Sequence, residues 1–313
     1  MSQQSVAVLG ASGFVGGATV RALLELGCDV IEVKTPRLAP RAEGTDFDPD
    51  DRSGLPQLAA SFLGVDAVVC ASGNPDASST DERALFAANA DVPALVGAAC
   101  KSAGVARFVH VSSAVVQGRL PQLDSTPETD AFSPYARSKA AGETAALKFG
   151  PSETVVYRPP SVHAPSRRVS RGIARIAASP LASVASPGTA PTPQTLVENV
   201  ASAIATLALS ERVPPNIVHH PWEGLTTASL MELLGGRPPR RVPTTVARPL
   251  VRALRAVGRF APQIAPHARR VEMLWFGQRQ GQSWLSEMGW TPPVGGAGWE
   301  QLGQTIRKET DTR

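Results

Sequence analysis

Short apolar runs alternate with longer amphipathic stretches over the first 160 residues. Short runs rich in β-branched side chains are typical of buried strands, and longer stretches with apolar positions three or four apart are typical of helices. We expect buried strands at residues 6–9, 30–33, 67–70, 108–111 and 154–157, and helices at residues 14–26, 55–62, 83–103 and 134–149. This alternation predicts an α/β protein with a parallel, doubly wound sheet.

The pattern changes after Arg158. Residues 159–193 carry many Pro, Ser and Gly residues and few strand signals, which predicts a loop-rich segment. A helix at residues 196–209 and a strand at residues 216–219 follow, and a small helical lobe is expected from about Trp222 onward. One more strand, best placed at residues 45–48, is weakly marked.

A glycine-rich segment lies between the first expected strand and the first expected helix. In Gly-Ala-Ser-Gly-Phe-Val-Gly, Gly10 allows a tight turn, Gly13 lets a pyrophosphate approach the backbone, and Gly16 permits close packing of the helix on the strand. The N-terminus of the helix adds free N–H groups and the positive end of its dipole. Because strand, loop and helix occur in this order, the segment predicts a dinucleotide-binding turn.

The glycine turn makes the expected fold a Rossmann-type doubly wound parallel sheet with a smaller C-terminal substrate lobe. We place the NAD(P)-binding domain at residues 1–160 and the substrate lobe mainly at residues 161–313, with residues 194–220 returning to the first domain. Other loop residues expected to bind the cofactor are Ser12, Phe14 and Val15.

The end of the second strand selects between NAD and NADP. An acidic residue there binds the ribose hydroxyls of NAD, whereas a cation tolerates the 2′-phosphate of NADP. Lys34 occupies this position, and Arg37 follows shortly after it. Glu32 lies inside the strand, and we expect it to point elsewhere. NADP(H) is therefore favoured and NAD(H) stays possible; the alternative is that both cations are merely solvated loop residues.

A tyrosine and a lysine begin the helix expected at residues 134–149. Ser133 is a suitable N-cap and Pro134 a suitable first residue, so Tyr135 and Lys139 share one helix face. A free tyrosine hydroxyl has a pKa of ~10. A nearby ammonium and a charged nicotinamide lower this pKa and suit the phenol to proton transfer at neutral pH, and Lys139 can also hold the nicotinamide ribose. Such pairs also occur by chance on helices.

Two serines, Ser112 and Ser113, follow the strand expected at residues 108–111. Ligands gather at the carboxyl ends of parallel strands, so a serine hydroxyl here lies where a substrate oxygen would bind. With the glycine turn and the Tyr135–Lys139 pair, this serine predicts an NAD(P)-dependent oxidoreductase. Such an enzyme moves a proton and a hydride at one carbinol carbon.

Bulk composition fits a globular protein. Hydrophobic residues make up 42% of the chain, and the net charge of +4 comes from cations scattered along it, which is a poor footprint for nucleic acid. No apolar stretch reaches the ~20 residues needed to span a bilayer. We find no signal peptide and no metal-ligand spacing, so we expect a cytoplasmic protein without a metal site. The cysteines show no paired spacing and are expected as buried thiols: Cys28, Cys70 and Cys100.

Several segments carry a resemblance to the extended short-chain dehydrogenase/reductase family, also called the NAD-dependent epimerase/dehydratase family. Residues 10–16 resemble its Gly-x-x-Gly-x-x-Gly loop, and residues 65–73 resemble its fourth-strand segment. Residues 158–163, Arg-Pro-Pro-Ser-Val-His, are similar to its Arg-Pro-x-x-Val-Tyr-Gly segment, and residues 287–293 are similar to its Leu-Gly-Trp-x-Pro signature. Asn89 occupies the place of the family's helix asparagine.

The resemblance implies roles for individual residues. Ser113, and not Ser112, would be the catalytic serine, and Gln117 replaces the tyrosine usual in a segment that helps to place the substrate. Asp46 and Phe47 would frame the adenine. Further cofactor-binding residues would be Ala71, Ser72, Gly73, Asn89, Val111, Pro159 and Val162, and substrate-binding residues would be Ser113, Gln117, Ser161 and His163.

The resemblance also orders the possible activities. Relatives that dehydrate sugar nucleotides have an acidic pair soon after the catalytic serine or threonine, whereas residues 114–116 are Ala-Val-Val. We favour a 4-ketoreductase of a nucleotide sugar. Residues 223–234 also loosely resemble a segment of such 4-ketoreductases. A UDP-sugar 4-epimerase, a hydroxysteroid- or flavonol-type dehydrogenase, and a non-catalytic NADP-sensing regulator remain alternatives. Relatives often form homodimers.

Residues 244–260 form a basic amphipathic pattern. Its arginines are Arg248, Arg252, Arg255 and Arg259, and the apolar residues expected to pack beneath them are Val246, Leu250, Val251, Leu254 and Val257. The favoured interpretation is the solvated basic face of a packed helix. Peripheral contact with a membrane and a surface that faces a diphosphate are the alternatives.

Overall fold

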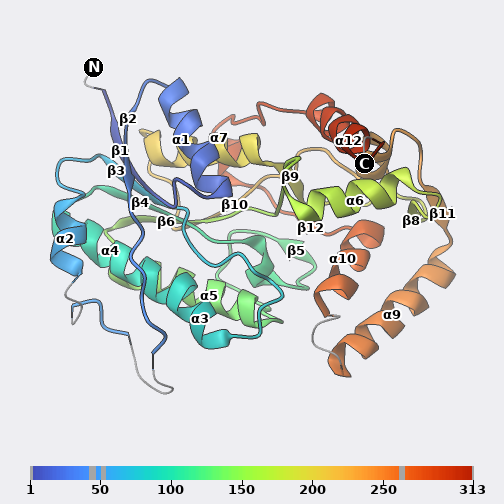
Figure 1. Ribbon diagram of the computed structural model, residues 1–313, viewed down its shortest axis with the longest axis horizontal. Coiled ribbons are helices and arrows are strands. Elements are labelled where there is room, and N and C mark those ends of the chain that lie inside the picture. Colours follow the sequence, from blue (N-terminus) through green and yellow to red (C-terminus); the bar gives the residue numbers. More distant parts are fainter. Residues whose placement is uncertain (1–2, 42–46, 51–53, 261–264, 312–313) are drawn as a thin grey trace.

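Six parallel strands form the central sheet of the molecule (Figure 1). The computed structural model describes residues 3–41, 47–50, 54–260 and 265–311, and within these the strands lie in the order β10-β6-β4-β3-β1-β2. Their bounds are β1 Ser5–Leu9, β2 Asp29–Val33, β3 Ala67–Cys70, β4 Arg107–Val111, β6 Glu153–Arg158 and β10 Ile217–His219. The crossover direction reverses between β1 and β3, which confirms the predicted doubly wound sheet and places a ligand crevice at their carboxyl ends.

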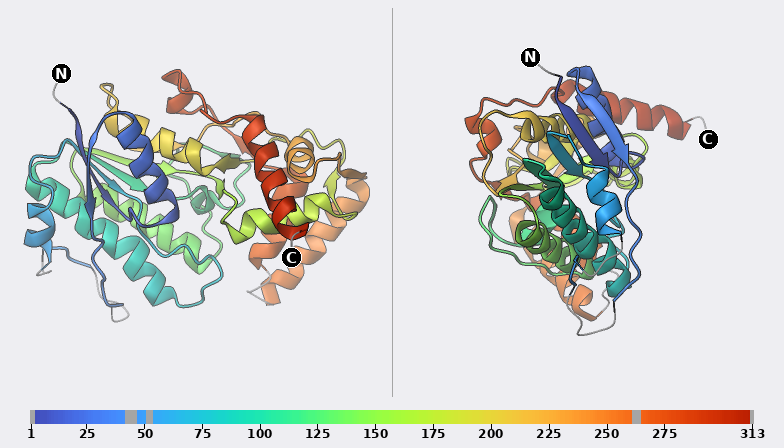
Figure 2. Two further views of the ribbon diagram at one scale, coloured as in Figure 1. Left: turned by 45° about the horizontal axis from the view of Figure 1, so that its top comes forward. Right: turned by 90° about the vertical axis from the view of Figure 1, so that its left-hand side faces the viewer.

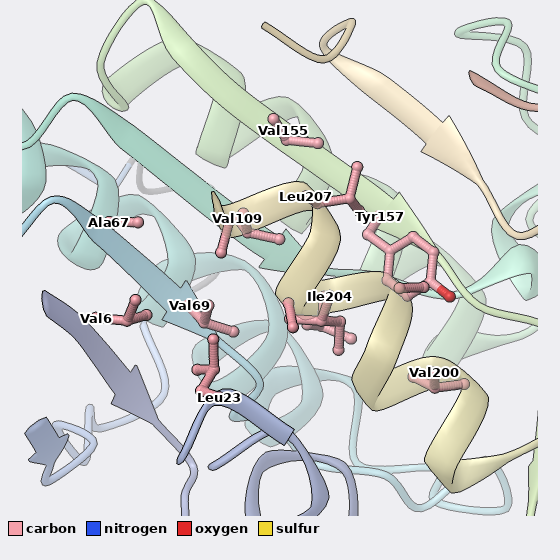
Figure 3. Close-up of a cluster of buried hydrophobic side chains, with 14 of the residues drawn as sticks. Val6, Leu23, Ala67, Val69, Val109, Val155, Tyr157, Val200, Ile204 and Leu207 are labelled. Carbon is pink, nitrogen blue, oxygen red and sulfur yellow. The ribbon is translucent and has the colours of Figure 1, made fainter. Parts of the chain in front are cut away.

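Helices cover both faces of this sheet. One face carries α1 (Phe14–Glu25) and α7 (Val197–Leu209), and the other carries α2 (Leu55–Ala60), α4 (Val92–Ala103) and α5 (Pro134–Phe149) (Figures 1 and 2). On the first face, Val69, Val109 and Ile204 are fully buried between the sheet and α7 (Figure 3). The helix α7 therefore shares a hydrophobic core with the sheet. Truncation of one such buried aliphatic side chain to alanine lowers the free energy of unfolding by about 2–5 kcal/mol.

Two of the sequence predictions for the first domain need correction. The strand expected to be buried at residues 30–33 is largely exposed, because β2 is an edge strand with β1 as its neighbour. The helix expected at residues 83–103 is interrupted. It consists of α3 (Glu82–Phe86), a wide π-helical turn at Ala87–Asp91, and α4. The turn carries Asn89, whose side-chain oxygen accepts a hydrogen bond from the backbone of Asn74 at 2.8 Å.

Residues 194–220 rejoin the sheet through α7 and β10, which pairs with β6. A buried chain of hydrogen bonds fastens this return. The hydroxyl of Tyr157 and Nδ1 of His220 lie 2.5 Å apart, and Nε2 of His220 lies 2.8 Å from the Glu223 carboxylate. That carboxylate also accepts a hydrogen bond from Asn199 of α7 at 3.0 Å. The segment therefore contributes to the cofactor-binding layer although it follows the first domain in the chain.

The remaining elements build the C-terminal lobe and the connections to it. The helices are α6 Arg168–Ala178, α8 Thr227–Gly235, α9 Thr244–Phe260, α10 Ala265–Phe276, α11 Trp284–Glu287 and α12 Gly296–Asp311. The short strands are β5 Gln122–Leu123, β7 Ser161–His163, β8 Ser183–Ala185, β9 Gln194–Leu196, β11 Arg240–Val242 and β12 Arg279–Gln280, and a 3-10 turn spans Ala114–Gln117. Along the ranges that the structure describes, no helix has the length and apolar character to cross a membrane.

The segment at residues 159–193 is less irregular than its composition predicts. It contains α6, whose buried Ile173, Ala174 and Ala177 pack against α8 in the core of the lobe. The weakly marked strand at residues 45–48 is not observed at Phe47 and Asp48, and its first two residues lie outside the described ranges.

Candidate active site

The turn between β1 and α1 depends on the absence of side chains at its glycines. Gly10 has a φ of +82°, and a Cβ there would lie 2.8 Å from the backbone nitrogen of Ser72. A Cβ at Gly16 would overlap the carbonyl oxygen of Gly10. The N-terminus of α1 therefore lies close against the strand ends, with room in front of Gly13 for a phosphate group.

A cavity of about 1150 Å³ opens in front of this turn. It follows the carboxyl ends of β1, β2, β3 and β4, and its volume is large enough to receive a dinucleotide. Most of the sequence-predicted site residues line it: Gly10, Ser12, Gly13, Phe14, Val15, Lys34, Arg37, Ala71, Ser72, Gly73, Asn89, Val111, Ser113, Tyr135, Lys139, Pro159, Ser161 and Val162. A close glycine turn at a helix N-terminus beside a large cavity fits NAD or NADP.

Phe47, one of the two residues expected to frame the adenine, does not line the cavity. It packs beside the buried cluster around Leu58 and Phe62. Asp46 lies outside the described residues. The aromatic side chain of Phe47 is held by its apolar neighbours, which the weak local sequence pattern did not indicate.

Charges of both signs lie at the β2 end of the cavity. Lys34 and Arg37 line it as expected, but Glu32 lines it too. Glu32 was expected to point elsewhere, but side chains alternate along a strand, so Glu32 and Lys34, two residues apart, project from the same side. The cavity therefore offers an acidic side chain as well as two cations near the ribose position.

Lys139 is anchored before any ligand binds. Its ammonium nitrogen is buried and donates a hydrogen bond to the carbonyl oxygen of Val111 at 2.8 Å. Burial lowers the pKa of Lys139 to about 8, against the opposing influence of Cys70 and Glu143. The lysine thus reaches from α5 to the end of β4, beside the serine pair.

The pKa of Tyr135 moves in the direction opposite to the one expected from its spacing to Lys139. Burial raises this pKa, and the cation that opposes the rise is Arg167. The guanidinium of Arg167 lies 4.7 Å from the ring centre of Phe14 and lines the same cavity. Sequence reasoning missed Arg167, because a cation in a loop before a helix carries no periodic signal.

The two serines at the end of β4 have different roles in the structure. Ser112 is buried and donates a hydrogen bond to the Glu143 carboxylate at 2.5 Å, and Glu143 forms a buried ion pair with Arg158 at 2.7 Å. Both serines line the cavity, but Ser113, at the start of the 3-10 turn, only accepts a hydrogen bond, from the backbone of Val115, so its hydroxyl proton is free for a ligand. The geometry thus favours Ser113 as the serine available to a ligand.

A second, smaller cavity of about 230 Å³ adjoins the first, and Ser113 and Ser161 line both. Apolar side chains such as Phe132 and Met273 form much of its wall, and α10 adds Arg269 and Arg270. Arg269 donates hydrogen bonds to the Gly118 carbonyl oxygen and to Gln278, both at 2.7 Å, and burial lowers its pKa to about 10.

Gln117 and His163, both expected to contact substrate, line neither cavity. The amide of Gln117 is buried and hydrogen-bonds Asp124 at 2.8 Å and 2.9 Å. His163 is buried behind the cavity wall, where its ring contacts Ser161 and Gln194 at 3.0 Å and 2.6 Å. Burial lowers the pKa of His163 to about 4, so the ring is neutral at physiological pH.

A glycine turn that leads into a helix, a strand-end serine and a Tyr–Lys helix around one cavity define an NAD(P)-dependent enzyme of the short-chain dehydrogenase/reductase type. The chain belongs to the NAD dependent epimerase/dehydratase family, whose family model matches residues 6–218. No curated protein sequence matches the chain significantly.

Solved structures share the fold over nearly the whole chain. MoeE5 in complex with UDP-glucuronic acid and NAD is 22% identical, with a TM-score of 0.60 and coverage of 99% of this chain and 100% of that one. The UDP-glucuronic acid 4-epimerase of Bacillus cereus in complex with NAD is 17% identical, with a TM-score of 0.64 and coverage of 98% and 99%. The dTDP-4-dehydrorhamnose reductase of Bacillus anthracis str. Ames in complex with NADP is 13% identical, with a TM-score of 0.64 and coverage of 98% and 100%.

Proposed function

We propose that the protein is an NADP(H)-dependent 4-ketoreductase of a nucleotide sugar. The observation that carries this proposal is the junction of the two cavities. Ser113 lines both of them, and Tyr135 and Lys139 line the larger one, so a keto group at the junction meets a hydrogen-bond donor and a phenol. Lys34 and Arg37 at the far end of the larger cavity support NADP(H).

Each of the three residues has a task in the proposed reaction. When bound, the nicotinamide cofactor supplies the hydride for the keto carbon. Tyr135 donates its proton to the carbonyl oxygen, and Ser113 donates a hydrogen bond to the same oxygen. Because the pKa of Tyr135 is raised, the phenol stays protonated at neutral pH and serves as the acid that reduction requires. Lys139 holds a positive charge beside the end of β4.

The smaller cavity supports a nucleotide sugar as substrate. Arg269 and Arg270 offer positive charge to a diphosphate. Hydrogen bonds to Gly118 and Gln278 and an ion pair with Glu272 hold Arg269 in place. Among the described residues that line this cavity there is no Asp or Glu, which speaks against elimination of water from the sugar. MoeE5, of the same fold, is seen with UDP-glucose and with UDP-glucuronic acid.

A UDP-sugar 4-epimerase is the second candidate, and Glu32 favours it. An acidic side chain at the ribose end of the cavity suits NAD, which an epimerase retains through its cycle. The two candidates differ in stoichiometry. A reductase consumes one reduced cofactor for each product, whereas an epimerase yields an isomer without net cofactor turnover.

The test is a turnover screen of the purified protein. UDP- and dTDP-4-keto sugars are supplied with NADPH or NADH, and product mass and cofactor absorbance are followed together. We expect loss of NADPH and a product that has gained two hydrogens, with Tyr135→Phe as the inactive control. UDP-hexoses without added cofactor test epimerisation, and a hydroxysteroid panel tests the apolar wall of the smaller cavity. Binding of NADPH without turnover of any substrate would support the regulator and refute the reductase.

A further inference from the structure

Helix α9 lies at the periphery of the C-terminal lobe (Figures 1 and 2). One side attaches it to the protein: Ala247 and Val251 are buried, and Arg255 forms an ion pair with Glu272 of α10, with 3.1 Å between Nε and the carboxylate. Most of its other described side chains, up to Val257, are exposed. Helix α9 therefore has a large face that no other described part of the protein covers.

Part of this free face is an apolar stripe. Val246, Leu250 and Val257 expose 57%, 48% and 50% of their surface, and Ala253 is exposed between them. Their spacing along the helix aligns them on one side. The sequence-based expectation that Val246, Leu250 and Val257 pack beneath the arginines was wrong, because α10 contacts a neighbouring side of the helix.

The other part of the free face is strongly basic. Arg248 and Arg252 are exposed and are separated from the apolar stripe by Pro249 and Ala256. Residues 237–259 contain seven arginines and no Asp or Glu. The charge is also uneven over the whole chain, since residues 161–313 hold 18 of the 31 Lys and Arg but 9 of the 27 Asp and Glu. The net charge of the whole protein is small, but its C-terminal lobe is strongly cationic.

We propose that α9 docks the protein on the surface of a bilayer that contains anionic phospholipid. A helix with an exposed apolar stripe and arginines on its polar side lies in the interface plane, with the apolar side chains at the boundary between headgroups and acyl chains and the long arginine side chains extending to the phosphates. The helix would rest on the membrane and would not span it. The proposal is independent of the reaction assigned to the active site.

The charges favour lipid over a second copy of this chain. A two-fold contact through the stripe would bring two copies of the cationic lobe together, and residues 233–271 contain no acidic side chain to neutralise that charge. Nucleic acid would use the arginines but would leave the exposed valines and leucine without a role. Anionic lipid satisfies the apolar and the basic parts of the face together.

The test is flotation of the full-length protein with vesicles. We expect binding to vesicles of equal parts phosphatidylcholine and phosphatidylglycerol, no binding to phosphatidylcholine alone, and release by high salt. Arg248→Gln combined with Arg252→Gln should weaken binding about 30-fold. Leu250→Asp should abolish it, because a charge in the stripe prevents burial of the helix.

A matched control is Leu63→Asp, since Leu63 is 68% exposed and follows shortly after α2, which lies at the opposite end of the molecule from α9 (Figure 1). This variant should bind vesicles as the native chain does. Melting temperature and NADPH binding, measured for each variant, show that the fold is intact. The proposal is overturned if the native chain ignores mixed vesicles, if Leu250→Asp binds them as well as Leu63→Asp does, or if α9 variants abolish self-association instead of lipid binding.

Discussion

The ammonium of Lys139 and the carbonyl oxygen of Val111 lie 2.8 Å apart in a hydrogen bond that ties α5 to the end of β4. The bond fixes a buried positive charge beside Ser112 and Ser113. Desolvation of this charge is unfavourable, which is why the pKa of Lys139 falls to about 8. The site therefore sacrifices some stability of the fold to keep an amine at this position.

Lys139→Met should reveal that cost. The folded chain holds the proton of Lys139 less tightly than the unfolded chain does, so the lysine opposes folding by about 3 kcal/mol at neutral pH. As pH rises from about 8 to 10.5 the native chain should gain this amount relative to the variant. Denaturant unfolding at neutral pH and above pH 10.5 measures the change, and a difference that is the same at both pH values would contradict it.

Tyr135→Phe should lower kcat for ketone reduction at least about 100-fold while NADPH binding stays within about twofold, because the proton donor is lost and the ring remains. The chain contains one other tyrosine, Tyr157, which is buried against His220. Tyr157→Phe is the matched control and should reduce the free energy of unfolding by about 1–3 kcal/mol without affecting kcat comparably. Equal kcat losses in the two variants would contradict a catalytic Tyr135.

Arg167→Gln should shift the pH dependence of the reverse reaction. Oxidation of the alcohol needs the Tyr135 phenolate, and Arg167 is the cation that lowers the pKa of this phenol. Its removal raises that pKa further, so the alkaline rise of kcat/KM should move to higher pH. Arg168→Gln is the control, because Arg168 is exposed and does not line the cavity. An unchanged midpoint in Arg167→Gln would refute this role.

Cofactor preference should respond to charge at the β2 end of the cavity. Lys34→Gln and Arg37→Gln should each weaken NADPH binding about 10-fold and leave NADH binding nearly unchanged, because the lost contact is to the 2′-phosphate. Glu32→Gln should act in the opposite sense and favour NADPH. Fluorescence titration with both cofactors measures these ratios, and equal effects on NADH and NADPH would show that the three side chains do not select.

Gly10→Ala should be far more damaging than an alanine at another glycine of similar backbone conformation. Gly27 also has a positive φ, of +79°, but a Cβ there meets nothing within 4 Å. Gly27→Ala should therefore cost about 1–2 kcal/mol for the left-handed backbone. Gly10→Ala adds a collision with the backbone of Ala71 and Ser72, and should also abolish cofactor binding. Equal melting temperatures for the two variants would refute this account of the turn.

Local patterns predicted those parts of the fold that depend on neighbours in sequence. The strand at residues 67–70 and the helix at residues 134–149 agree with β3 and α5 to the residue, since each has a run of suitable side chains with clear ends. The glycine turn could also be predicted from the sequence, because the backbone there requires glycine. Most residues expected around the cofactor do line one cavity, although their roles in binding stay predictions.

The sequence was less informative where a side chain's direction depends on distant partners. Gln117 is hydrogen-bonded to Asp124 and His163 to Gln194, and neither side chain lines a cavity. Glu32 is among the residues that line the cavity, which its position inside a strand did not indicate. Arg167 contacts Phe14 from far along the chain. Each of these facts follows from tertiary packing.

The late return of the chain through α7 and β10 also has a consequence for synthesis. When the ribosome has made only the first half of the protein, α7 is not yet available to cover the sheet face that carries Val69 and Val109. Exposed aliphatic surface of this kind is prone to aggregation. The core can close once residues up to His219 have emerged. A nascent chain of this protein therefore needs protection, by a chaperone or by rapid elongation, for longer than its first domain alone would require.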